Sequence, residues 1–311
     1  HDPSRRQRQM CIRDRYNGNP APEIGAVVCR VAPSFLRFGS YQIHTADGNH
    51  ATLQTLLNHT IENHFPEHDI SHDKGRIAWL NDVAKRTALM IAHWMRIGFV
   101  HGVMNTDNMS IHGLTIDYGP YGWLEDYDPN WTPNTTDASR RRYRYGNQPQ
   151  IGAWNIARLA EAIAPLMEDV QLLYQVLENY DSYYVNYQNE MWAKKLGIDD
   201  FQEEDEAMIV ELNKLLQEAE TDMTIFFRLL SHIQEPKIAL LNDAFYQPNN
   251  VPEEDWNNWL SKWWSRVDGK PNSQAMLSAN PKYVLRNWMA QLAIDSAEQE
   301  DYSICEELFE L

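Results

Sequence analysis

Several features that would indicate particular classes of protein are scarce or missing in this 311-residue sequence. It contains no uninterrupted apolar run of the roughly 18 residues that a membrane-spanning helix needs, so we expect no membrane partner. Its 27 Lys and Arg against 44 Asp and Glu give a net charge of −17, which disfavours nucleic acid, because the phosphate backbone binds basic surfaces. Three cysteines without a Cys-x-x-Cys pair, and the lack of a signal-peptide-like apolar stretch, favour the cytoplasm.

Hydrophobic periodicity predicts an α+β fold that is predominantly helical. A β-branched run at 25–32, ended by Pro33, predicts one strand. Helical spacing of apolar residues then recurs to the end of the chain, in segments 52–63, 76–96, 151–167, 170–190, 203–218, 221–232, 253–264, 282–298 and 303–311. Residues 121–150 are rich in Asp, Asn, Pro, Arg and Tyr, which predicts a long ordered loop of a kind that is uncommon unless functional.

The segment 99–120, "FVHGVMNTDNMSIHGLTIDYGP", gathers ligand-type side chains between two predicted helices. We predict two short strands here, the second at 115–119, "TIDYG", with a polar loop between them. Asn108 follows His101 by seven residues and Asp117 follows Asn108 by nine, an order typical of the metal-holding segment of kinase-like phosphotransferases. Amide and carboxylate oxygens suit Mg²⁺. The Asp-Tyr-Gly at 117–119 resembles the kinase Asp-Phe-Gly, in which Gly119 would let the backbone turn sharply.

One member of the kinase set is missing. A kinase catalytic loop carries Asp two residues after its His, but Val103 occupies that position, and its isopropyl group cannot accept a proton. A carboxylate stands instead at Asp107, beside Asn108. An alternative without function is that Asp107 caps a turn and Asn108 bonds the backbone. We favour a functional role, because both accompany His101 and Asp117.

Blocks along most of the chain resemble the selenoprotein O (YdiU-type) protein adenylyltransferase family, from about residue 22 onward: "RVAPSFLRFGSYQ", "GFVHGVMNTDNMSIHGLTIDYGP", "YGNQPQIGAWNIARLAEAI" and "NPKYVLRNWMAQLAI". The resemblance implies a protein-kinase-like fold that binds ATP in a reversed orientation and transfers AMP to Ser, Thr or Tyr hydroxyls of proteins. It implies that Asp107 accepts the proton and that Asn108 and Asp117 bind Mg²⁺, with Mn²⁺ as an alternative. It also implies that Arg30, Arg37 and Asp117 contact the ATP.

The resemblance further implies how the chain is divided. We interpret residues 1–20, which begin basic in an otherwise acidic chain, as an unstructured or foreign tail, with a natural basic tail as the alternative. Residues 21–75 would form the end of the small lobe and a connection, and residues 76–311 a helical large lobe with family-specific C-terminal helices. The family's Gly-rich loop and its Lys have no counterpart before Arg30. We therefore expect a fragment without most of the N-terminal lobe and the extreme C-terminus, with weak or no ATP binding and no appreciable transfer.

Two other functions remain open from the sequence. One is a small-molecule kinase of the aminoglycoside-phosphotransferase type, against which Val103 counts. The other is a catalytically dead kinase-like scaffold. The basic segment 139–146, "SRRRYRYG", could bind phosphate or a protein substrate. We favour the other interpretation, in which it orders its own loop by pairing with nearby acidic residues, Asp126, Asp128 and Asp137.

Two clusters of residues have structural interpretations that we favour over functional ones. A zinc site is conceivable at four neighbouring histidines, His59, His64, His68 and His72. Pro66 interrupts a common helical register and no cysteine joins them, which disfavours the site. Four tryptophans near the C-terminus have helical spacing and are expected in the core: Trp256, Trp259, Trp263 and Trp264.

Overall fold

The structure, a computed structural model, describes residues 29–311. These residues are mostly helical and include one sheet, of two strands, which confirms the predicted α+β class. The predicted strand at 25–32 is wrong for its described part, since residues 29–32 form no strand. A strand requires a neighbouring strand to satisfy its backbone hydrogen bonds, and no described segment pairs with residues 29–32.

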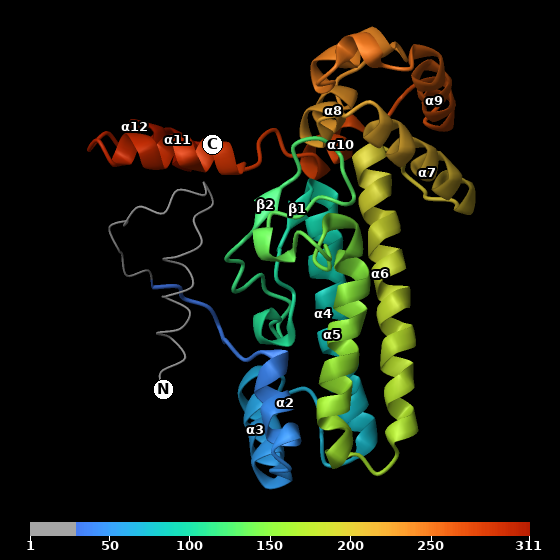
Figure 1. The fold of residues 1–311 in the computed structure, drawn as a ribbon. Helices are drawn as coiled ribbons and strands as arrows, with labels where there is room; N and C mark the ends of the chain where they lie inside the picture. Colours follow the sequence, from blue (N-terminus) through green and yellow to red (C-terminus); the bar gives the residue numbers. More distant parts are fainter. Residues whose placement is uncertain (1–28) are drawn as a thin grey trace.

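Three long helices form the centre of the molecule and run side by side (Figure 1): α4 (Asp73–Ile97), α5 (Gln148–Ile163) and α6 (Leu173–Leu196). They form because apolar residues recur at helical spacing and bury one stripe of each helix. The His72 ring accepts the Gly75 N–H at the start of α4, and Gly98, at φ 73°, ends it as predicted.

Helices α2 (Phe38–Ala46) and α3 (His50–His64) lie at one end of this central group (Figure 1). The buried Tyr41 hydroxyl of α2 bonds the Thr60 hydroxyl of α3 at 2.6 Å, and Thr45 donates to the Ala162 carbonyl of α5 at 2.6 Å. These bonds fasten α2 to its neighbours, so the residues at the start of α2 have a defined position relative to α5.

The other end carries a second buried apolar cluster, formed largely by α7 (Glu203–Glu218), α8 (Met223–Leu230), α9 (Glu253–Arg266) and α10 (Ser273–Ala279). Trp256, Trp259 and Trp263 are fully buried in it, which confirms three of the predicted core tryptophans, while Trp264 is partly exposed. Helix α10 and a 3-10 helix at Ile238–Ala244 were not predicted.

Two C-terminal helices, α11 (Asn287–Ala297) and α12 (Ser303–Glu310), contact each other and extend away from the rest of the molecule (Figure 1). They fall within the segments 282–298 and 303–311 that the sequence predicts as helices. Within the part of the chain that the structure describes, no helix combines the length and apolar character that crossing a membrane requires.

The ring of His112 makes the stability of this fold depend on pH. It stacks on Phe65 at 5.1 Å between ring centroids, and its Nε2 is buried without a hydrogen-bond partner among the described residues. Burial, and then the charges of His64 and Arg86, lower the pKa of His112, while Asp82 opposes them. The unfolded chain therefore binds the proton more readily, and the free energy of unfolding falls as pH drops below the ordinary histidine pKa of about 6.5.

A His112→Phe variant should thus lose less stability between about pH 7.5 and about pH 5.5 than the parent chain does. The phenyl ring can keep the stack on Phe65 but cannot take up a proton. Urea unfolding at the two pH values measures the difference. Equal losses in the two proteins would contradict the assignment of this pH dependence to His112.

Candidate functional site

The central polar segment begins at a short strand. Strand β1 (Phe99–Val100) pairs antiparallel with β2 (Gly122–Trp123), with Phe99 opposite Trp123. The prediction of a second strand at 115–119 is wrong, because Thr115 makes only an isolated bridge to Met109. Asp117 lies in the left-handed region at φ 52°, which interrupts the extended backbone that a strand needs. Residues 101–121 consequently form one long loop between β1 and β2.

Three buried amide side chains from elsewhere in the chain hold the start of this loop. Gln148 of α5 accepts the His101 N–H at 3.0 Å and donates to the Phe99 carbonyl at 2.9 Å. Asn155, also on α5, donates to the Met104 carbonyl at 2.9 Å, and Asn134 donates to the Gly102 carbonyl at 3.0 Å. Analysis of the sequence assigned none of these three a role. A signal was present for Asn155, a polar residue on the apolar face of a predicted helix.

His101 joins the two halves of the loop from inside. The ring is fully buried, and burial lowers the pKa of His101, so the ring is neutral near pH 7. Its Nε2 lies 2.8 Å from the Ile116 carbonyl, so Nε2–H donates, and Nδ1 accepts the Val103 N–H at 3.4 Å. The residue next to Ile116 is Asp117. His101 is therefore a positioning residue, because it fixes the backbone immediately before Asp117, the candidate metal ligand.

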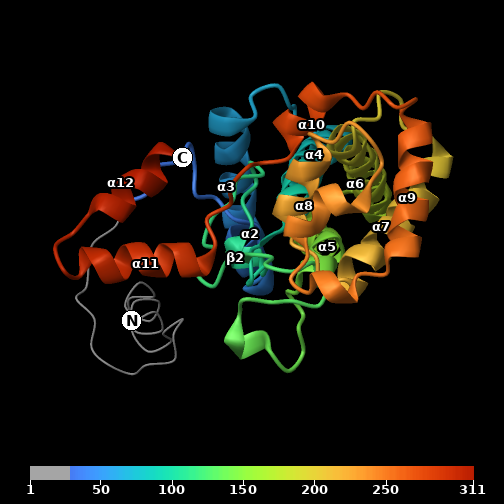
Figure 2. The ribbon, with the colours of Figure 1, turned by 90° about the horizontal axis from the view of Figure 1, so that it is seen from above.

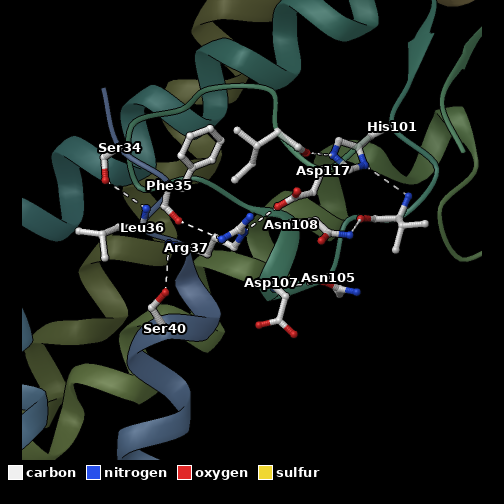
Figure 3. Close-up of polar contacts among 12 residues, drawn as sticks. Ser34, Phe35, Leu36, Arg37, Ser40, His101, Asn105, Asp107, Asn108 and Asp117 are labelled. Carbon is white, nitrogen blue, oxygen red and sulfur yellow. Dashed lines mark hydrogen bonds and ion pairs between the residues drawn. The ribbon is translucent and has the colours of Figure 1, made fainter. Parts of the chain in front are cut away.

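Asp117 is paired with Arg37, which lies 80 residues earlier in the chain. The Arg37 Nε donates to the Asp117 Oδ2 at 2.6 Å, and the two side chains are 32% and 24% exposed (Figure 3). The backbone of Arg37, just before α2 begins, also forms an isolated antiparallel β-bridge with Ser110. The loop and the start of α2 are thus joined by both backbone and side chain.

The second predicted arginine also reaches this part of the loop. The exposed Arg30 guanidinium lies 4.3 Å above the ring centre of Tyr118, the residue after Asp117. Both arginines that the resemblance assigned to ATP therefore lie at the Asp-Tyr-Gly segment. The chain does turn at residues 119 and 120, but the φ of Gly119 is not positive, and the left-handed backbone falls at Asp117 itself.

Asn108 lies beside the Arg37–Asp117 pair in Figure 3. Its Nδ2 donates to the Val103 carbonyl at 2.8 Å, which is the backbone bond expected from the alternative without function. The same bond orients the amide, and it leaves Oδ1 without a hydrogen bond among the described residues. Asp117 likewise uses only Oδ2 on Arg37. An amide and a carboxylate oxygen are hard ligands of the type that Mg²⁺ prefers, so this donor set fits the ion. Shared metal binding by Asn108 and Asp117 stays a prediction.

Asp107 lies in a 3-10 turn, Thr106–Asn108, and its side chain is exposed. It is Asn105, not Asp107, that caps the turn, by accepting the Asp107 N–H at 3.0 Å. The Asp107 carboxylate makes no hydrogen bond with another described residue. It lies against Gly39 of α2, where a Cβ would come within 1.9 Å of Oδ1. In Figure 3 it points away from the Arg37–Asp117 pair, so its role as proton acceptor stays a prediction.

The four histidines, two in α3 and two between α3 and α4, do not assemble the conceivable zinc site. His64 faces the ring of His112 instead, at 5.0 Å between centroids. His68 comes close to two carboxylates, those of Glu67 and Asp82. Arg86 already bonds both Asp82 oxygens, at 3.0 and 2.9 Å, and neutralises them. We therefore assign no metal here.

The basic segment 139–146 is not ordered by ion pairs, which makes the favoured interpretation wrong in that respect. Among the described residues, its arginine side chains form no salt bridge with Asp126, Asp128 or Asp137. Asp137 does order the loop, but by accepting backbone N–H groups, those of Arg142 at 3.0 Å and of Tyr143 at 2.7 Å. Backbone amides satisfy this carboxylate and leave the guanidinium groups available.

Comparisons with known proteins bear on this arrangement. The family model described as "Protein adenylyltransferase SelO" matches residues 10–311, and so begins inside the predicted tail at 1–20. The chain is 50% identical to the protein nucleotidyltransferase YdiU of Flavobacterium johnsoniae, over 95% of this chain and 59% of that protein. It is 48% identical to the protein of the same name from Aromatoleum aromaticum, over 97% of this chain and 60% of that protein.

The chain thus spans about three fifths of the length of these curated relatives. The match nevertheless covers the whole of the loop that holds Asp107, Asn108 and Asp117, together with Arg30 and Arg37. It also covers the three central helices and both C-terminal ones. The chain belongs to the SelO family of protein adenylyltransferases.

Proposed function

We propose that this chain provides the metal-binding and acceptor side of a site that transfers AMP from ATP to Ser, Thr or Tyr hydroxyls of proteins, on a protein-kinase-like fold. The contact between Arg37 and Asp117, with Asn108 beside it, carries the proposal. It brings a cation suited to phosphate and two metal-type oxygens to one place. The names of the relatives, which are protein nucleotidyltransferases, support the same reaction class.

The reaction assigns a task to each residue. The acceptor hydroxyl oxygen forms a bond to the α-phosphorus of ATP, the bond from that phosphorus to the bridging oxygen breaks, and pyrophosphate leaves. Asp107 takes the hydroxyl proton. Arg30 and Arg37 stabilise the charge that builds on pyrophosphate, since guanidinium groups bind phosphate oxygens in pairs. Asn108 and Asp117 would hold Mg²⁺ or Mn²⁺, which neutralises phosphate charge when bound.

The surroundings of Val103 favour transfer of AMP over transfer of the terminal phosphate. Its backbone N–H and carbonyl are both engaged, by His101 and Asn108, and its side chain has no proton acceptor. A kinase needs a base at this position. With the nucleotide reversed, the α-phosphorus faces the acceptor, and the free carboxylate at Asp107 can serve from a different place.

A chimera offers the direct test. In it, the part of the Flavobacterium johnsoniae relative that this chain does not match is joined to this chain, to give the length of the relatives. Incubation with ATP, Mg²⁺ and a bacterial protein extract, followed by mass spectrometry, should find AMP on Ser, Thr or Tyr. Phosphate in place of AMP would contradict the reversed nucleotide, and no modification of the proteins would favour the small-molecule kinase or the inactive scaffold.

Gly39→Ala should lower AMP transfer by the chimera without unfolding it. The new methyl group would stand 1.9 Å from the Asp107 Oδ1, so this exposed carboxylate must rotate away. The expected loss is about tenfold to a hundredfold, at or below the lower end of what general acid–base catalysis commonly contributes, because the carboxylate is displaced and not removed. Initial rates of AMP incorporation measure it, and circular dichroism checks the fold. In an Asp107→Asn background the same change should add nothing, whereas a further independent loss would contradict the link between Gly39 and Asp107.

A further inference from the structure

The segment Ser139–Gly146 carries four arginines within eight residues of a chain whose net charge is −17. Two of them, Arg140 and Arg141, are exposed. One guanidinium nitrogen of Arg141 donates a hydrogen bond to the Asn130 carbonyl at 3.3 Å. No described carboxylate pairs with any of the four, because Asp137 uses both oxygens on backbone N–H groups. This segment is therefore a local positive surface on an acidic protein.

The fold displays these guanidinium groups on a fixed loop. Arg142 lies over the ring of Trp154, 4.6 Å from its centre, and its carbonyl accepts the Asn147 side chain at 3.1 Å. The buried Tyr145 hydroxyl donates to the Met95 carbonyl of α4 at 2.6 Å. A loop held at both ends loses little conformational entropy when it binds a partner.

The same loop is fastened to the candidate site. Asn134, which lies just before a 3-10 turn at Thr135–Asp137, is buried and donates to the Gly102 carbonyl at 3.0 Å. Gly102 follows His101, the residue that positions Asp117. Figure 2 shows the connection between β2 and α5 at the outer edge of the molecule, where a large partner can approach it.

We propose that Ser139–Gly146 is a docking surface for an acidic stretch of the protein substrate, an inference that rests on the proposed function. Clustered arginines attract carboxylates and repel basic segments. Elsewhere the acidic chain repels an acidic polypeptide, so such a stretch is held on this loop. Its neighbouring hydroxyl is then held close to the loop 101–121, to which Asn134 fastens this segment and which carries Asp107. The surface selects substrates in which the acceptor lies near a run of Asp or Glu.

Peptide binding to the 311-residue chain tests this without nucleotide. The probe is a fluorescein-labelled peptide with one Tyr in a run of Glu, compared with the same peptide carrying Gln, and the readout is fluorescence anisotropy. The test variant is the triple change Arg140→Gln, Arg141→Gln and Arg144→Gln. The matched control also removes three positive charges, through three exposed lysines that pair with their own acids, Lys214→Gln, Lys237→Gln and Lys262→Gln.

The Glu peptide should bind the parent chain and the control about equally, and the arginine variant about tenfold more weakly, with the difference shrinking as salt rises. Equal weakening in both variants would reduce the effect to net charge and overturn the proposal. Equal binding of the Gln peptide would overturn it as well. Tighter, arginine-dependent binding of inorganic phosphate or of duplex DNA would assign the surface to phosphate instead.

Transfer by the chimera separates this inference from the proposed function. If both hold, the arginine variant raises KM for the Glu peptide and leaves kcat close to that of the parent. Arginine-dependent peptide binding without AMP transfer would support the docking surface and contradict the proposed adenylyltransferase function. AMP transfer with the same KM in parent and arginine variant would support the proposed function and contradict the docking surface.

Discussion

Replacing Asp117 with alanine should lower AMP transfer by the chimera roughly a thousandfold, which corresponds to about 4 kcal/mol of transition-state stabilisation. The change removes the charged member of the proposed metal-ligand set. It also releases Arg37, whose Nε now contacts Asp117 at 2.6 Å, so the guanidinium loses the contact that fixes its position. Initial rates with radiolabelled ATP at saturating Mg²⁺ measure the loss.

The Arg37→Ala variant is the matched control, because it breaks the same ion pair but leaves the carboxylate in place. Mn²⁺, followed by the disappearance of its free-ion paramagnetic resonance signal without ATP, because ATP itself binds Mn²⁺, should bind the Arg37→Ala chimera and not the Asp117→Ala chimera. If both variants bind Mn²⁺ equally, Asp117 is a structural partner of Arg37 and not a metal ligand. Thermal unfolding of the two variants should differ little, since the pair is partly exposed.

The largest loss of stability is expected at Asp222. This buried residue bonds Arg286 through both oxygens, Oδ2 to Nη1 at 2.7 Å and Oδ1 to Nη2 at 2.8 Å. Its Oδ1 also accepts the Ile225 N–H at 2.9 Å, which caps α8, and Oδ2 accepts the Tyr246 hydroxyl at 3.2 Å. Asp222→Ala should lower the free energy of unfolding by about 3–5 kcal/mol, because it leaves a buried guanidinium without this partner and removes a helix cap.

Urea unfolding followed by tryptophan fluorescence measures this loss, since three buried tryptophans lie in the apolar cluster to which α8 belongs. Arg286 immediately precedes α11, so protease cleavage near residue 286 should also accelerate. Lys262→Ala, which breaks an exposed pair with Glu211, should cost under about 1 kcal/mol. A loss of that small size at Asp222 would mean that Glu125, which lies 3.1 Å from Arg286, compensates the charge by itself.

The long helices were predicted well from the sequence, and so were the short helices α8 and α12, whereas the two-residue strands and α10 were not. The predicted segment 203–218 has the same bounds as α7, and 76–96 lies within α4. In a long helix the apolar residues recur over several turns, so the helical period is clear in the sequence. The strands β1 and β2 have two residues each, which are too few for an alternating pattern. The second strand was expected at 115–119, and it lies at 122–123 instead. Helix α10 has seven residues and was missed for the same reason.

By itself, the sequence determined the helical class, the order of His101, Asn108 and Asp117 along the loop, and the family through continuous blocks of residues. These are local properties, carried by neighbours along the chain. Only the tertiary structure decided that Arg37 contacts Asp117, that the Asp107 carboxylate lies against Gly39, and that amides of Gln148 and Asn155 hold the loop. Each of these contacts joins residues about 40 or more positions apart, and it exists because α2 and α5 pack against each other and present their side chains to the same loop.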